Sequence, residues 1–243
     1  REELVERVRQ SPSAPQILIA RADPVYGGAY DLARRLVCVA TGVRPEFPAV
    51  AVQALIRARV ERVIERSLVH ETVVFLSELA GAPFERDHEV GIAVVRSDTQ
   101  LLGDRMKIAF GRWLAAEAAA HPAVVVLEDL EHADRASIDL LEEAMRQAEQ
   151  APLFVLGLAR PSIDEKLPAI FRERRRIELC LGPLPDSAVR ELVQSVAYDI
   201  DGIDSDSLAE RTGGNPLLVE ELIRAAAAGR ASASRSTWAS GRV

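Results

Sequence analysis

Three short apolar runs without polar alternation divide the chain, and a turn or a helical pattern follows each of them. These runs are Gln16–Arg21, Val124–Leu127 and Leu153–Ala159. A continuous apolar run bounded by turn residues is typical of a strand that is covered on both faces of a parallel sheet. We expect a fourth, shorter strand over Ile177–Leu181.

Between these runs, apolar residues recur three and four positions apart, which predicts helices with one buried face. The clearest pattern begins at Leu102 and stops before His121, because Pro122 disfavours helical backbone in the residue ahead of it. We expect no regular structure over residues 84–98. The helices expected from this pattern cover residues 1–10, 29–40, 50–79 (as two or three helices), 102–120, 136–150 and 162–174.

Strands that alternate with helices over residues 16–181 predict an α/β fold with a parallel sheet and covering helices. After Gly182-Pro183 only helical patterns remain, so we expect a small all-helical subdomain. The predicted organisation is a core over residues 1–183, a helical lid over 184–230 and a flexible tail over 231–243. The helices expected in the subdomain cover residues 186–196, 205–211 and 215–228.

Composition narrows the possible partners. The net charge is −7, so the chain lacks the basic surplus that drives binding to nucleic acid. No apolar run is long enough to span a membrane. We therefore expect a cytoplasmic protein. Cys38 and Cys180 lie far apart without a CxxC motif, which argues against a disulfide framework or a zinc site and favours buried thiols. The four histidines show no metal-binding or hydrolase spacing.

The strongest chemical signal is VVVLEDLEHAD, residues 124–134, where an apolar run leads directly into Glu128 and Asp129. The carboxyl end of a strand in a parallel sheet faces the ligand crevice. One carboxylate there can hold Mg²⁺, and its neighbour can orient an attacking water. The alternative is a strand that ends in a solvated acidic turn.

A second signal is TGGNPLLVEELI, residues 212–223. Gly214 lies in a flexible turn, Asn215 is a good N-cap and Pro216 suits the first helical position. Without other information, this pattern indicates a well-capped helix.

Together these segments resemble the STAND signal-transduction ATPases, a branch of the P-loop ATPases related to AAA proteins. The likeness is to the ATPase domains linked to bacterial Ser/Thr protein kinases and signalling regulators. It covers roughly residues 1–230, and its motifs recur in order: VVVLEDLEHAD, an apolar strand ending in LARP, IELCLGPLP and TGGNPLLVEELIR.

The resemblance implies a nucleotide-dependent switch that binds ATP and Mg²⁺, hydrolyses ATP slowly and signals to protein partners or neighbouring domains. It places Glu128 at the Mg²⁺-associated Walker B position, acting through water, and Asp129 at the water-polarising position. Arg160 matches the sensor of the γ-phosphate. Pro216, with Gly214 and Asn215, matches the lid motif near the nucleotide base.

One departure from the family is large, because the sequence contains no GxxxxGK[ST] phosphate loop. We therefore expect an incomplete P-loop sheet, in a fragment or degenerate copy that begins just after that loop. The resemblance also implies a strand order with Val124–Leu127 between Gln16–Arg21 and Leu153–Ala159. Ile177–Leu181 should then either close up against Leu153–Ala159 or stand detached from it.

Other functions remain open. A non-catalytic protein-interaction module could keep the ATPase scaffold without the chemistry, whereas a DNA-binding regulator would need a basic recognition helix, and the sequence shows none. The run Arg172–Arg176 could supply an arginine finger, although a solvated helix end explains it more simply.

Overall fold

The computed structural model describes residues 2–12, 14–25, 27–85, 87, 90–168, 170–171, 176–196 and 205–225. The chain divides into two compact units, within residues 1–175 and within residues 176–243. The helices and strands are α1 (Glu2–Arg9), β1 (Gln16–Arg21), α2 (Asp31–Thr41), α3 (Ala49–Val60), α4 (Arg66–Leu79), α5 (Ile92–Arg96), α6 (Thr99–Ala120), β2 (Ala123–Glu128), η1 (Leu130–His132), α7 (Arg135–Gln147), β3 (Leu153–Gly157), α8 (Ile163–Lys166), α9 (Asp186–Val196) and α10 (Ser205–Thr212).

The sheet of the first unit has the order β1-β2-β3, and both pairings are parallel. Gln16 pairs with Ala123, and Ala123 pairs with Leu153 on its other side. The three expected strands and the central place of Val124–Leu127 are therefore confirmed. The fold class is confirmed at the level of a mixed α/β unit with a small parallel sheet and covering helices.

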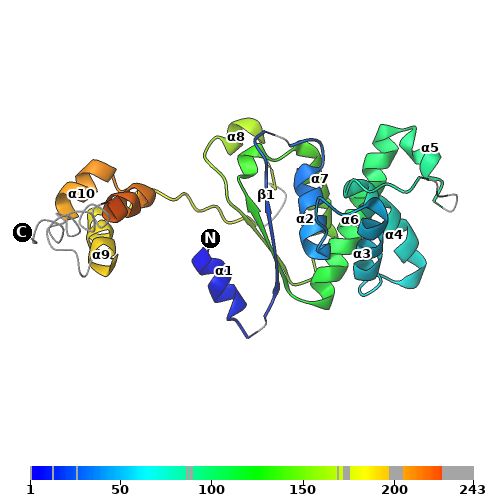
Figure 1. The fold of residues 1–243 in the computed structure, drawn as a ribbon, viewed down its shortest axis with the longest axis horizontal. Helices are drawn as coiled ribbons and strands as arrows, with labels where there is room; N and C mark the ends of the chain where they lie inside the picture. The colour runs from blue at the N-terminus through cyan, green and yellow to red at the C-terminus, as the bar shows by residue number, and fades with distance from the viewer. Residues whose placement is uncertain are drawn as a thin grey trace, which may run out of the picture. The chain divides into compact units, whose positions relative to one another are not determined.

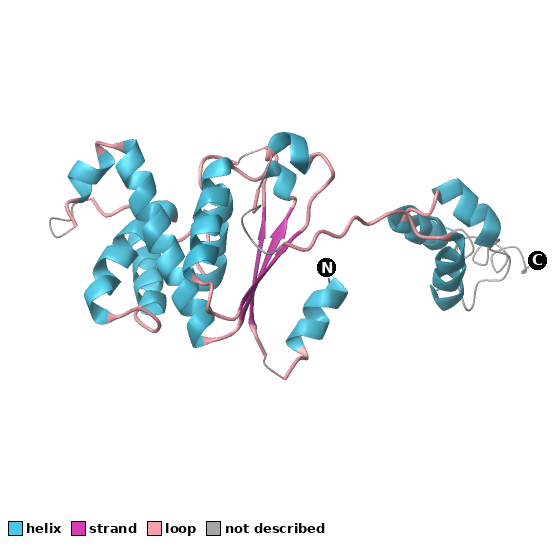
Figure 2. Cartoon of the chain, turned by 180° about the vertical axis from the view of Figure 1, so that it is seen from behind, coloured by secondary structure: helices cyan, strands magenta, loops and turns pink. Residues whose placement is uncertain are grey.

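The two faces of the sheet differ in cover. Leu18, Val125 and Leu127 belong to the main hydrophobic core, together with residues of α2 and α7. Both helices lie on the same side of the sheet (Figure 1). On the opposite face, where α1 lies, Ile19 is half-buried and Phe154 is 58% exposed. Figure 2 shows the same division from behind. The apolar runs suggested cover on both faces. Among the described residues, one face is fully covered, and the other is covered in part, since Val126 is buried there and Phe154 is exposed.

Beyond α2 and α7, the helices α3, α4 and α6 pack into a second layer. Trp113 and Phe110 of α6 are fully buried there, with their ring centroids 5.8 Å apart. Glu117 is also buried, and its carboxylate accepts hydrogen bonds from Arg59 of α3 at 2.6 and 2.7 Å and from the Trp113 indole at 3.0 Å. The buried carboxylate of Glu117 is therefore paired with a guanidinium and an indole N–H.

Two expectations about helices are wrong. Residues 92–96 form α5, because Ile92 and Val95 are buried against the core, and five residues are too few to show a helical period. Within the predicted helix 162–174, α8 covers only four residues and ends at Lys166. The next residue, Leu167, has a φ of −130°, because the proline that follows it disfavours helical backbone. Residues 172–175 lie outside the described part.

The expected strand Ile177–Leu181 is also wrong. The segment carries no regular structure, and Ile177, Leu179 and Leu181 are between 81% and 94% exposed. A strand needs a neighbour for its backbone groups, and no strand of the described sheet lies beyond β3. Cys180 is exposed with this segment and Cys38 is half-buried, so the expectation of two buried thiols fails for Cys180.

In the second unit, the described residues include α9, α10 and helical residues 216–225, which surround a small core and match the helices expected there. Leu184, at its start, packs on that core, while residues 226–243, including the expected tail, lie outside the described part. In the portion of the chain that is described, no helix has the length and apolar character needed to cross a membrane. The buried residues of this core are Val189, Val193, Leu208, Ala209, Val219 and Ile223.

Candidate functional site

The candidate catalytic residues lie at the carboxyl edge of the sheet. Because all three strands are parallel, their carboxyl ends meet at one edge, which is where open α/β sheets bind ligands. The register pairs Arg21, the last residue of β1, with Glu128, the last residue of β2. Asp129 follows Glu128 directly, and Arg160 follows β3. The structure thus brings the predicted residues to one edge.

Asp129 has a left-handed backbone, with φ 53° and ψ 42°. Aspartate tolerates this conformation better than most residues do, because its short side chain bonds locally. The turn allows the Asp129 carboxylate to accept a hydrogen bond from Arg21 Nε at 2.5 Å. The acidic pair is therefore joined to the end of β1 by an ion pair that the sequence pattern did not indicate.

Arg160 contacts a different carboxylate, that of Glu131. The Arg160 backbone N–H donates to Glu131 Oε2 at 3.2 Å, and Arg160 Nε lies 3.5 Å from Glu131 Oε1. Glu131 is buried, and its Oε1 accepts no hydrogen bond, although His132 Nε2 lies 3.8 Å away. Sequence reasoning missed Glu131, because its position in the 3₁₀ turn after β2, rather than its residue type, buries it.

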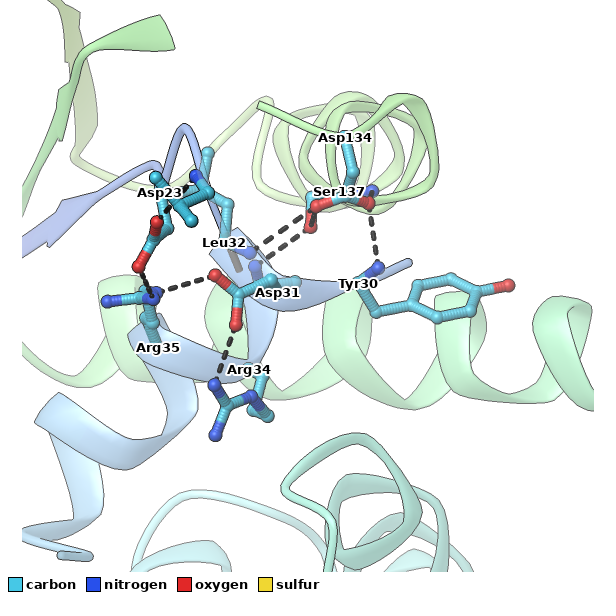
Figure 3. Close-up of polar contacts among 10 residues, drawn as sticks. Asp23, Tyr30, Asp31, Leu32, Arg34, Arg35, Asp134 and Ser137 are labelled. Carbon is cyan, nitrogen blue, oxygen red and sulfur yellow. Dashed lines mark hydrogen bonds and ion pairs between the residues drawn. The ribbon is translucent and has the colours of Figure 1, made fainter. Parts of the chain in front are cut away.

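Asp134, the last acidic residue of the motif, binds the first turn of α2. Its carboxylate accepts hydrogen bonds from the N–H groups of Tyr30 at 2.7 Å and Leu32 at 3.4 Å, and from Ser137 N and Oγ at 2.8 and 2.7 Å. Ser137 Oγ in turn accepts from Ala33 N at 3.0 Å (Figure 3). This one side chain therefore caps the beginnings of α2 and α7.

A cluster of ion pairs lies beside this cap. Asp31 accepts from Arg34 and Arg35, both at 2.6 Å, and Arg35 also donates to Asp23 at 3.0 Å (Figure 3). Burial would raise the pKa of Asp31, but the hydrogen bonds and charges of the two arginines outweigh burial and lower it. The hydrogen bond to Asp31 likewise raises the pKa of Arg35, against its own desolvation. The cluster is held in its charged form.

The lid motif lies in the second unit and is a capped helix start. Gly214 has a φ of 73°, and a Cβ there would lie 2.2 Å from the Leu184 carbonyl oxygen, so only glycine fits. Its own carbonyl accepts from Leu184 N at 2.8 Å. Asn215 Oδ1 accepts from Leu217 N at 3.0 Å, and Pro216 is the first helical residue. The capping role is confirmed, and a nucleotide-binding role stays a prediction.

Mg²⁺ is a hard cation that prefers oxygen ligands and commonly uses one or two carboxylates plus phosphate and water. The described residues include no cluster of three or more potential metal-binding side chains. Glu128 and Asp129 could supply the two carboxylates, and Arg21 already shares the second of them. The donor set therefore suits a cation that takes most of its ligands from a phosphate and from water.

The chain matches no family model, no curated protein and no solved structure.

Proposed function

We propose that this chain forms part of the ATP-binding core of a signal-transduction ATPase of the STAND type, working as a nucleotide-dependent switch in the cytoplasm. One observation carries the proposal: Glu128 and Asp129 lie at the carboxyl end of the central strand of a parallel sheet. Side chains at this place can reach a ligand bound across the strand ends.

In this proposal each predicted residue has one task. Glu128 holds Mg²⁺ through water, Asp129 orients the attacking water, and Arg160 reads the γ-phosphate of ATP. Gly214 and Pro216 match the family motif that the resemblance assigns to the base of ATP or ADP. Arg21 competes with Mg²⁺ and water for the Asp129 carboxylate, which favours slow hydrolysis, as suits a switch.

The proposal assigns phosphate binding to polypeptide that is not among these 243 residues, because no GxxxxGK[ST] motif occurs in them. Successive backbone N–H groups and a lysine normally hold the β- and γ-phosphates. The acidic pair and the lid motif touch only other parts of the nucleotide. We therefore expect the chain by itself to bind ATP feebly.

Titration calorimetry with Mg·ATP tests this proposal on two proteins: the chain itself, and the chain extended at its N-terminus by a strand and phosphate loop typical of the family. The extended protein should bind, and the chain alone should bind more weakly than about 10 μM, an affinity worth about 7 kcal/mol. An extended protein that folds and binds no nucleotide would overturn the proposal.

A second candidate is a non-catalytic protein-interaction module that keeps the scaffold. The ion pair between Asp129 and Arg21 favours it, because this carboxylate already has a partner within the protein. The two candidates differ in whether the extended protein hydrolyses ATP.

A further inference from the structure

The outer edge of β1 carries backbone groups that no strand uses. At the two ends of β1, the N–H groups of Gln16 and Ala22 donate at 2.8 and 2.9 Å to carbonyls on the β2 side. Backbone groups of successive strand residues face opposite sides, so those of Ile17 and Ile19 face outward. In the described portion, no strand pairs with this edge. An unpaired edge is a template for a further strand.

A groove of about 660 Å³ borders this edge. Its walls come from Ile19–Arg21, from α2, and from the loop between α2 and α3. Three successive residues of β1 line the groove. Successive side chains of a strand point to opposite faces of the sheet, so a groove that touches all three runs along the edge of the strand. Val52 and Ala82, both buried, contribute an apolar floor. The space lies in the range of known ligand pockets, about 300–1,000 Å³.

Every charged residue that lines this groove is an arginine. Carboxylates outside the lining hold three of these side chains in place. A guanidinium is a planar fork with five N–H donors, so Arg34 and Arg35 can each donate to a ligand as well as to Asp31. The fourth, Arg44, is exposed and has no ion pair among the described residues. The acidic side chains of α1 line another cavity, which shares only Ile19 with the groove. The four arginines are Arg21, Arg34, Arg35 and Arg44.

We infer that this groove binds an extended, acidic peptide segment of a partner protein, which adds as a fourth strand to the outer edge of β1. The outward N–H and C=O of Ile19 pair with the peptide backbone, which supplies affinity. The arginines pair with peptide carboxylates, and the apolar floor takes the side chains between them. A small organic anion would satisfy the arginines and leave the strand edge unpaired, so a peptide fits both features.

The probe is a fluorescein-labelled heptapeptide of alternating Glu and Val. Its binding to the full chain is measured by fluorescence anisotropy. Two matched peptides separate the contributions: one has Lys in place of Glu, and the other has N-methyl groups on alternate amides, which remove backbone donors. We expect binding to weaken at least about tenfold with either change. Arg44→Glu should weaken binding of the Glu peptide similarly, whereas Arg62→Glu, an exposed arginine outside the groove, should not.

Two further readouts locate the peptide. Hydrogen exchange should show new protection over residues 17–21. In a Cys180→Ser background, Cys38, which lines the groove, should react more slowly with iodoacetamide when the peptide is bound. Equal binding of the N-methylated peptide would show attraction by charge alone and overturn strand addition. Equal binding of the Lys peptide, no effect of Arg44→Glu, or no binding at about 1 mM would overturn the site itself.

Discussion

At the scale of single residues, one carboxylate joins two helices. Asp134→Ala would leave the N–H groups of Tyr30 and Ser137 without their acceptor in a partly buried place. We expect the free energy of unfolding to fall by about 2–4 kcal/mol, measured by urea denaturation. Asp139→Ala, which removes only an exposed ion pair with Arg135, should cost less than about 0.5 kcal/mol. Equal losses would contradict the double cap.

The second residue-scale prediction concerns pH. The lowered pKa of Asp31 means that its ionised form stabilises the fold at pH values above its ordinary 3.8, and this contribution is lost as the pH falls through the lower folded value. Asp31→Asn should therefore be less stable than the unmodified chain at pH 6, and the difference should shrink below pH 3.8. Urea denaturation at both pH values measures this. A difference independent of pH would show that Asp31 acts by packing alone.

The acidic pair provides the third residue-scale prediction, in the chain extended by the phosphate loop. Asp129→Asn should keep nucleotide binding and slow hydrolysis, because it removes the group that orients water. Glu128→Gln should instead weaken the Mg²⁺ dependence of binding. Phosphate release and calorimetry at varied Mg²⁺ separate the two effects. Identical results for both variants would refute the assigned roles, and two silent variants would favour the interaction module.

At the scale of elements, the hydrophobic pattern predicted the long helices and the buried strands. The patterns of α6 and β2 gave these elements within a few residues, because many side chains in each face the core. The segment Ile177–Leu181 is also mostly apolar, but a strand forms only where a neighbour pairs with it. Local pattern carries no information about such a neighbour.

The same limit applies to the candidate site. The sequence placed Glu128 and Asp129 at a strand end, and the parallel sheet confirms that position. The sequence pattern could not show that Asp129 pairs with Arg21, 108 residues away. The spacing of apolar residues within one segment contains no information about contacts between distant segments. The bond from Tyr30 N to Asp134, across 104 residues, was unpredictable for the same reason.

The unequal cover of the sheet yields a prediction at this scale. Val125 is fully buried against the helices, whereas Phe154 on the neighbouring strand points to the other face and is mostly exposed. Val125→Ala should lower the free energy of unfolding by about 1.5–3 kcal/mol, and Phe154→Ala by less than about 1 kcal/mol, although it removes more atoms. Urea denaturation compares them. A larger loss at Phe154 would show that this face is covered in solution.

At the scale of the whole molecule, the two thiols distinguish the two units. Cys180 is exposed. Burial raises the pKa of Cys38, and the charges of Arg34 and Arg35 offset this rise only in part. Because the thiolate is the reactive form, we expect a disulfide reagent at pH 8 to give two phases at least about tenfold apart in rate. Cys180→Ser should abolish the fast phase and Cys38→Ser the slow one. The reverse assignment would contradict the described exposures.

The pairing of β1 with β2 also has a consequence for how the protein is made. Gln16 pairs with Ala123, and α2 to α6 lie between them in the chain. At about 5–20 residues per second, ribosomal synthesis of the intervening hundred or so residues takes roughly 5–20 s. During this interval β1 is an apolar strand without a partner, while the helices can form from local contacts. We therefore expect the nascent chain to be most prone to aggregation before β2 emerges.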